Sequence, residues 1–266
     1  MRDVLPLIKR YAPQAKVIFY TIDLHFLREK RDAELKKDQK LLEAAKRLKK
    51  EEVGMMQAAD HTILLSNAEL EIIKEIDSKI ETSYLPIWQD VPGPVNSFEQ
   101  RKNIVFVGGF AHTPNVDAVQ YFVAEIWPDV IAKLPNLEFH IVGNNIPDSI
   151  KKLASDSIKI IGFVPKLKDV FEPYRLSVAP LRFGAVQKGK VVSSLCHGLP
   201  CIATSIAAEG IGLKEEEEII VTDNPKVFAE KIIDTYQDKK RCVELSQAGL
   251  KFAQQHLSED LSLIHI

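Results

Sequence analysis

The chain has 266 residues, of which 45% are hydrophobic and 27% charged, which is ordinary for a soluble globular protein. This length suits two domains of usual size, and no run of about eighteen apolar residues is present to cross a bilayer. The formal net charge is −2, and the basic residues between 28 and 50 alternate with acidic ones. The composition therefore argues against nucleic-acid binding.

Three cysteines, Cys196, Cys201 and Cys242, form no C-x-x-C pair. An odd, unmatched set suits a reducing compartment, so we interpret all three as structural thiols. No apolar signal-peptide core follows Met1. We expect a cytoplasmic protein, with peripheral association at the inner membrane face left open.

Both ends of the sequence are unusual. The amphipathic piece Val4-Leu5-Pro6-Leu7-Ile8 runs straight into a strand, as if earlier βα units were missing, so we expect a fragment. Residues 261–266 resemble a translated sequencing adapter, and we interpret them as a non-native tail. The alternative of an apolar terminal strand stays open.

The first part of the chain alternates strands and helices. A β-branched and aromatic run at residues 16–22 predicts a strand covered on both faces, followed by the loop Asp23-Leu24-His25. Apolar residues at helical spacing predict one long amphipathic helix from about Arg28 to Ala59. Further elements are a strand at 61–65, a helix at 68–76 and a final segment at 83–87.

A polar, proline-rich stretch interrupts this pattern, with Pro92-Gly93-Pro94 at its centre. Its composition predicts an interdomain linker at residues 89–102. We therefore expect a partial N-terminal domain at residues 1–88 and a C-terminal domain at residues 103–260.

The C-terminal domain shows six strand patterns, each followed by a helical one, which predicts an α/β fold with a doubly wound parallel sheet. Pro128 interrupts the apolar stripe of the helix expected at 116–134 and must bend or split it. The strands are expected at 104–107, 137–142, 158–161, 176–179, 201–203 and 219–221.

In an open parallel sheet, ligands bind at the carboxyl ends of the strands. One such loop runs from Phe106 to Asn115 through Gly108 and Gly109 to a helix start, where a ligand can approach the backbone. It lacks the G-x-G-x-x-G pattern, which disfavours a nicotinamide enzyme. A simple tight turn is the alternative interpretation.

A second loop, residues 179–190, is richer in chemistry. It contains Gly184, Lys188, Gly189 and Lys190 and opens a helix at 191–197. Glycines, two lysines and a helix N-terminus favour a phosphate-bearing ligand.

Three runs, Asn103–Ala118, Ala179–Gly198 and Cys201–Gly210, resemble glycosyltransferase family 4 (glycosyl transferases group 1). The similarity is to the bacterial subgroup whose loop reads A-P-L-R-[FY]-G-A-G-x-K-G-K. It implies a GT-B fold, with two Rossmann-like domains and the N-terminal one incomplete. It also implies a nucleoside-diphosphate-sugar donor held by the C-terminal domain, a glycan or lipid-linked acceptor, and retention of anomeric configuration.

The resemblance also implies roles for particular residues. No D-x-D triplet is present, in agreement with chemistry that needs no metal and no cofactor. The leaving diphosphate then requires protein groups, for which Lys188 is the first candidate, with Arg182 and Lys190. His25 resembles a cleft histidine near the transferred sugar, and a merely structural loop histidine is its alternative. The remaining donor-site candidates are Gly108, Gly109, His112, Gly162, Phe163, Val164, Gly184, Gly189 and Ser193, with the donor base expected at the 162–164 backbone.

The chain departs from the family pattern at two acidic positions. Ala185 and Ser193 stand where many members have glutamates eight residues apart, although Ser193 can still hydrogen-bond a ribose hydroxyl. The prediction is a retaining, hexosyltransferase-like enzyme of cell-surface polysaccharide synthesis. A non-catalytic nucleotide-sugar-binding scaffold is the main alternative, and a GT-B sugar-nucleotide epimerase a further one.

Overall fold

The computed structural model describes residues 4–85, 87–185 and 189–258, and the 261–266 tail lies outside these ranges. The chain forms two compact units. Of the described residues, the first comprises 4–85 with the loop segments 183–185 and 209–211, and the second comprises the remainder. The boundary thus falls between residues 85 and 87, and two later loops join the first unit.

Unit 1 contains a three-stranded parallel sheet in the order β1-β2-β3. Strand β1 is shorter than the 16–22 run predicts, and Ile18 and Tyr20 are 58% and 53% exposed, so the expectation of cover on both faces is wrong. The elements in chain order are α1 (Leu5–Tyr11), β1 (Ile18–Tyr20), α2 (His25–Lys36), α3 (Gln39–Ala58), β2 (His61–Leu64), α4 (Asn67–Ile76) and β3 (Thr82–Tyr84).

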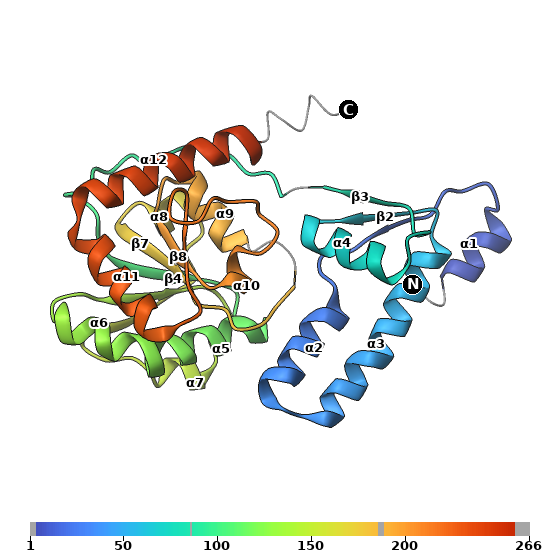
Figure 1. The fold of residues 1–266 in the computed structure, drawn as a ribbon, viewed down its shortest axis with the longest axis horizontal. Helices are drawn as coiled ribbons and strands as arrows, with labels where there is room; N and C mark the ends of the chain where they lie inside the picture. The colour runs from blue at the N-terminus through green and yellow to red at the C-terminus, as the bar shows by residue number, and fades with distance from the viewer. Residues whose placement is uncertain (1–3, 86, 186–188, 259–266) are drawn as a thin grey trace. The chain divides into compact units, whose positions relative to one another are not determined.

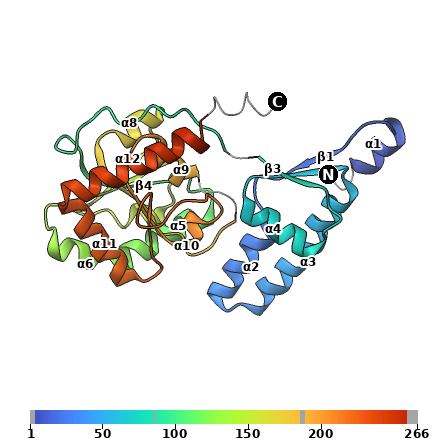
Figure 2. The ribbon, with the colours of Figure 1, turned by 45° about the horizontal axis from the view of Figure 1, so that its top comes forward.

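The single long helix expected from Arg28 to Ala59 is instead a hairpin of two helices, α2 and α3, which lie side by side (Figures 1 and 2). Lys37 ends α2 in the left-handed conformation, with φ of 54°. Asp38 then caps α3, because its side chain accepts hydrogen bonds from the backbone of Lys40 and Leu41. The helical spacing was correct, but a cap and a left-handed residue break the helix in two.

The core of unit 1 joins this hairpin to β2 and α4 through Phe26, Met56, Leu64 and Ile73, all 3% exposed or less. Ala185 packs into the same cluster. The side chain of Arg31 also fixes the added loops, binding Gly184 O at 2.7 Å and both carboxylate oxygens of Glu209 at 2.7 Å each.

Unit 2 contains a six-stranded parallel sheet in the order β6-β5-β4-β7-β8-β9, which confirms the doubly wound prediction. The direction of winding reverses between β4 and β7, so the switch point lies between these neighbours. The strands are β4 (Lys102–Val107), β5 (Phe139–Val142), β6 (Ile158–Gly162), β7 (Tyr174–Ala179), β8 (Cys201–Ala203) and β9 (Ile220–Val221).

Helices cover both faces of this sheet (Figure 1). Helices α9 and α12 pack together on one face, and α6 and α11 pack on the other. As expected for Pro128, the predicted 116–134 helix is divided by a π-helical turn, Phe122–Ile126. The helices are α5 (Thr113–Tyr121), α6 (Trp127–Lys133), α7 (Asp148–Lys151), α8 (Leu167–Phe171), α9 (Gly189–Cys196), α10 (Ser205–Ala208), α11 (Pro225–Gln237) and α12 (Lys239–His256).

The stretch expected to be a linker is bound to unit 2. The carboxylate of Glu172 accepts hydrogen bonds from the backbone N–H groups of Val95 and Asn96, at 3.0 and 2.9 Å. Gly93 N donates to Cys196 O at 3.0 Å. Arg101 is 4% exposed and donates to Gly198 O at 2.9 Å. A polar composition resembles that of a tether, but these partners hold the segment in place.

Candidate functional site

The loops after β4, β5 and β6 meet at the carboxyl edge of the unit 2 sheet. Backbone hydrogen bonds join them in series, Gly108 N to Val142 O at 3.0 Å and Gly143 N to Gly162 O at 2.8 Å. A Cβ added at Gly143 would lie 1.8 Å from Gly108 O, so only glycine permits this approach. The sequence-predicted Gly108, Gly109 and Gly162 therefore belong to one continuous surface.

Asn115 and Lys190 connect the first loop to the second. The Asn115 side chain donates to Gly109 O at 2.8 Å and accepts from Lys190 Nζ at 2.9 Å. A Cβ at Gly108 would lie 2.8 Å from Asn115 Cγ. Lys190 Nζ also lies 5.4 Å from the centre of the Phe106 ring. Burial lowers the pKa of the Lys190 ammonium to about 8. Lys190 and the paired glycines, predicted separately, thus form one cluster.

Arg182 has a partner that the sequence did not indicate. Its guanidinium pairs with both carboxylate oxygens of Asp117 on α5 and stacks over the Tyr121 ring at 4.8 Å. The Asp117 hydrogen bond raises the pKa of Arg182. To bind a diphosphate, Arg182 must exchange this bidentate pair for another anion.

The two positions that depart from the glutamate pattern are buried. Ala185 is 2% exposed in the unit 1 core. Ser193 is 6% exposed, and its hydroxyl donates to Gln89 Oε1 at 2.7 Å. In this structure the Ser193 hydroxyl is therefore hydrogen-bonded within the protein, to Gln89.

Part of the second loop, including Lys188, lies outside the described residues. Helix α9 begins at Gly189, and its residues from Val191 to Cys196 are buried. Lys190 thus lies in the first turn of α9, and the N-terminal end of a helix favours an anion.

The last predicted donor segment lines a shallow recess of about 670 Å³ beside β6. Gly162 has φ of +83°, and the Phe163 side chain is 69% exposed. Val164 instead packs against the cluster around Val105 and Leu199. His112 is the N-cap of α5, and its carbonyl accepts from Asn115 N at 3.0 Å.

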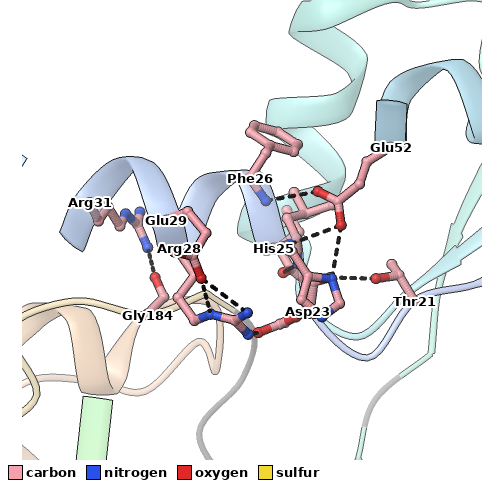
Figure 3. A network of polar contacts seen from close by, with 11 residues as sticks. Thr21, Asp23, His25, Phe26, Arg28, Glu29, Arg31, Glu52 and Gly184 are labelled. Carbon is pink, nitrogen blue, oxygen red and sulfur yellow. Dashed lines mark hydrogen bonds and ion pairs between the residues drawn. The ribbon is translucent and has the colours of Figure 1, made fainter. Parts of the chain in front are cut away.

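His25 in unit 1 has two acidic neighbours (Figure 3). Its Nδ1 lies 2.8 Å from Glu52 Oε1, and its Nε2 lies 3.2 Å from Asp23 Oδ1. Asp23 also pairs with Arg28, and Glu69 accepts a hydrogen bond from Leu24 N at 3.0 Å. The predicted loop histidine is therefore held in a charged network that involves α2, α3 and α4.

The sequence interpretation missed Glu52, although a signal was present. Position 52 falls four residues after Leu48 and four before Met56, on the apolar stripe of α3. A carboxylate on a buried stripe must have donors, and this one is 5% exposed. Asn115 and Asp117 offered no comparable signal, because their partners are distant in the sequence.

The remaining histidines and cysteines discussed below lie in packing or hydrogen-bonding environments within the protein. His140 contacts Tyr174 and Glu138, and His197 stacks on Phe171. The three cysteines are buried and free, and burial raises each thiol pKa to about 11. Across the described ranges, we find neither a cluster of three acidic, His or Cys side chains suited to a metal nor a helix with the length and hydropathy of a membrane span.

Comparison with known families identifies the family to which most of unit 2 is similar. Residues 101–238, more than half of the chain, match the family described as "Glycosyl transferases group 1". An uncharacterized 44.6 kDa protein of the Klebsiella pneumoniae cps region is 23% identical over 184 residues, covering 65% of this chain and 47% of that protein. The chain thus spans about half the length of this relative.

Solved structures share the fold at low identity. Sucrose-phosphate synthase from Thermosynechococcus elongatus gives a TM-score of 0.73 at 16% identity, over 93% of this chain and 65% of that one. S. aureus TarM, solved with α-GlcNAc-glycerol and UDP, gives 0.71 at 16% identity, over 82% and 45%. Anabaena HepE, solved with UDP and glucose, gives 0.66 at 12% identity, over 100% and 76%.

Proposed function

We propose, from the premise that this chain belongs to the glycosyl transferases group 1 family and has the GT-B fold, that it transfers a sugar from a nucleoside-diphosphate sugar to a glycan or lipid-linked acceptor. The observation that carries the proposal is the cluster at the switch point of unit 2. There, paired glycines, Asn115, Lys190 and the first turn of α9 gather at the carboxyl edge of β4 and β7.

Each part of this cluster suits one part of the donor. Gly108 and Gly109 let the side chains of Asn115 and Asn144 pack against the loop backbone, and the first turn of α9 with Lys190, which Asn115 joins to this loop, suits the diphosphate. Lys188 completes the cationic set in this proposal. The exposed Phe163 and the recess beside Gly162 suit the base.

The proposed setting is cell-surface polysaccharide synthesis, because the Klebsiella relative lies in a cps region. We propose UDP as the donor nucleotide, since TarM and HepE were solved with UDP. Retention of configuration, hexosyl transfer without a metal, and action at the cytoplasmic membrane face complete the proposal.

Calorimetric titration with UDP, GDP and dTDP tests the donor site. We expect UDP to bind, and Lys190→Met to weaken its binding by about tenfold or more, equal to about 1.4 kcal/mol. Lys168→Met on α8 is the matched control, because Lys168 is exposed in the same unit. No binding of any nucleotide by the folded parent would refute the donor-site assignment.

One observation favours a second candidate, a non-catalytic nucleotide-sugar-binding scaffold. Ala185 and Ser193 replace two carboxylates, and both are buried in protein contacts. Both candidates predict nucleotide binding, so release of UDP from UDP-glucose or UDP-GlcNAc is the deciding measurement. Turnover that survives EDTA supports the metal-independent enzyme, and saturable binding without turnover supports the scaffold.

A further inference from the structure

Glu52 on α3 contacts the first turn of α2 through three donors. Its carboxylate accepts from Phe26 N at 2.8 Å, from His25 N at 3.2 Å and from His25 Nδ1 at 2.8 Å. The backbone N–H of His25 and its ring nitrogen share the same oxygen, Oε1 (Figure 3). One buried side chain therefore fixes both the backbone and the ring of His25.

The burial of Glu52 has a physical explanation in these donors. A carboxylate that is 5% exposed requires hydrogen bonds to offset the loss of water. Two come from backbone N–H groups at a helix N-terminus, where the helix dipole also favours a negative charge. The third comes from the imidazole, so His25 is part of what keeps Glu52 buried as an anion.

This arrangement favours a proton on one ring nitrogen. Both ring nitrogens face carboxylates, which can only accept when ionised, but the Nδ1–Glu52 contact at 2.8 Å is shorter than the Nε2–Asp23 contact at 3.2 Å, so Nδ1 is the favoured site of the proton when the ring is neutral. The variable nitrogen is then Nε2, beside Asp23. The His25 side chain is 50% exposed, whereas those of Glu52 and Asp23 are 6% and 8% exposed. The imidazole is thus the accessible member of the three.

We propose that Glu52 is a positioning residue for sugar transfer, holding the His25 ring in the Nδ1–H tautomer so that Nε2 meets the transferred sugar or its attacking hydroxyl. The inference rests on the proposed function for its catalytic meaning. Glu52 itself touches no substrate, and it acts by orienting His25. Asp23 contacts the opposite edge of the His25 ring through one carboxylate oxygen. Its other oxygen is paired with Arg28, which holds the Asp23 carboxylate in place.

Long-range ¹H–¹⁵N NMR of the parent protein gives the first test and needs no variant. At a pH where His25 is neutral, we expect its Nδ1 to be the protonated nitrogen. A neutral ring protonated at Nε2 would overturn the inference. His61, whose Nε2 lies 2.9 Å from the Ser83 hydroxyl, serves as the reference ring in the same spectrum.

Glu52→Gln gives the second test, because an amide cannot satisfy all three donors. We expect its turnover to fall by about tenfold or more, with a donor KM within about twofold of the parent, as for loss of an orienting partner. The His25 tautomer should become mixed. Glu75→Gln, an exposed position on α4 in the same unit, is the matched control and should behave as the parent.

The outcomes separate the inference from the proposed function. A parent without turnover overturns the proposed function and, with it, the catalytic meaning of Glu52. An active parent whose Glu52→Gln variant turns over equally overturns the inference alone. If Glu52→Gln melts below the assay temperature, the tautomer in the parent decides.

Discussion

The ammonium group of Lys190 donates a 2.9 Å hydrogen bond to the side chain of Asn115, which lies 75 positions earlier in the chain. The side-chain amide of Asn115 in turn donates a hydrogen bond to the carbonyl oxygen of Gly109 at 2.8 Å. The start of α9 and the glycine loop after β4 are therefore linked through one amide. Loss of that amide should affect both loops together.

Asn115→Ala is expected to lower the free energy of unfolding by about 1–3 kcal/mol, because the buried Lys190 ammonium and the Gly109 carbonyl lose a partner. Nucleotide binding should weaken as well, since the loop geometry depends on this side chain. Urea denaturation and calorimetry measure the two effects. Asn136→Ala, at an exposed turn of the same unit, is the control. Unchanged stability in Asn115→Ala would contradict the proposed link.

The Lys190 ammonium also predicts a pH dependence. Burial lowers its pKa from the ordinary value of 10.5 to about 8, so the folded protein releases this proton before the unfolded chain does. Between pH 8 and 10.5 the unfolded state binds more protons, so this group's contribution to the free energy of unfolding rises with pH. Below pH 8, its cost to stability is complete and constant.

The test compares the parent with Lys190→Met in urea denaturation at several pH values across this window. The stability of the parent relative to the variant should increase from pH 8 to 10.5. Nucleotide affinity should fall in the parent as pH rises through about 8, because the cation is lost, and should stay flat in the variant. If stability and nucleotide affinity changed with pH in the same way in both proteins, the Lys190 ammonium would not be the source of the pH dependence.

Much of the fold follows from local signals in the sequence. β-branched and aromatic runs such as 104–107 mark strands, glycines mark their ends, and the doubly wound order follows from their alternation with helices. The α2–α3 break was not foreseen, because Lys37 in a left-handed conformation has no sequence signature. In the site, the lysine and glycine loops were predicted individually. Their connection through Asn115 was not, because tertiary partners leave no pattern in one sequence.

Glu172 is expected to anchor residues 94–101 to unit 2. Glu172→Ala leaves the N–H groups of Val95 and Asn96 without their acceptor and should lower the free energy of unfolding by about 2 kcal/mol. The freed segment should also become more sensitive to proteases. Asp169→Ala, at an exposed position on α8, the helix that ends just before Glu172, should do neither. Denaturation and limited proteolysis of both variants check the prediction, and an equal response to cleavage would show that the segment is held by other contacts.

Arg182 offers a direct comparison of a structural and a catalytic role. Its side chain is 36% exposed and that of Asp117 is 21% exposed, so we expect a coupling energy of about 0.2–1 kcal/mol in a double-mutant cycle of Arg182→Ala and Asp117→Ala. Because the guanidinium already has a bidentate partner, nucleotide affinity should remain within about twofold of the parent in both single variants.

Calorimetry on the same four proteins separates the two roles. Weaker nucleotide binding in Arg182→Ala, with unchanged or tighter binding in Asp117→Ala, would mean that Arg182 leaves Asp117 to bind the diphosphate, as the sequence predicted. Equal affinity across the cycle, with a measurable coupling in stability, means that Arg182 fastens the loop after β7 to α5. In that case the charge on the leaving diphosphate has to be met by the lysines and the first turn of α9.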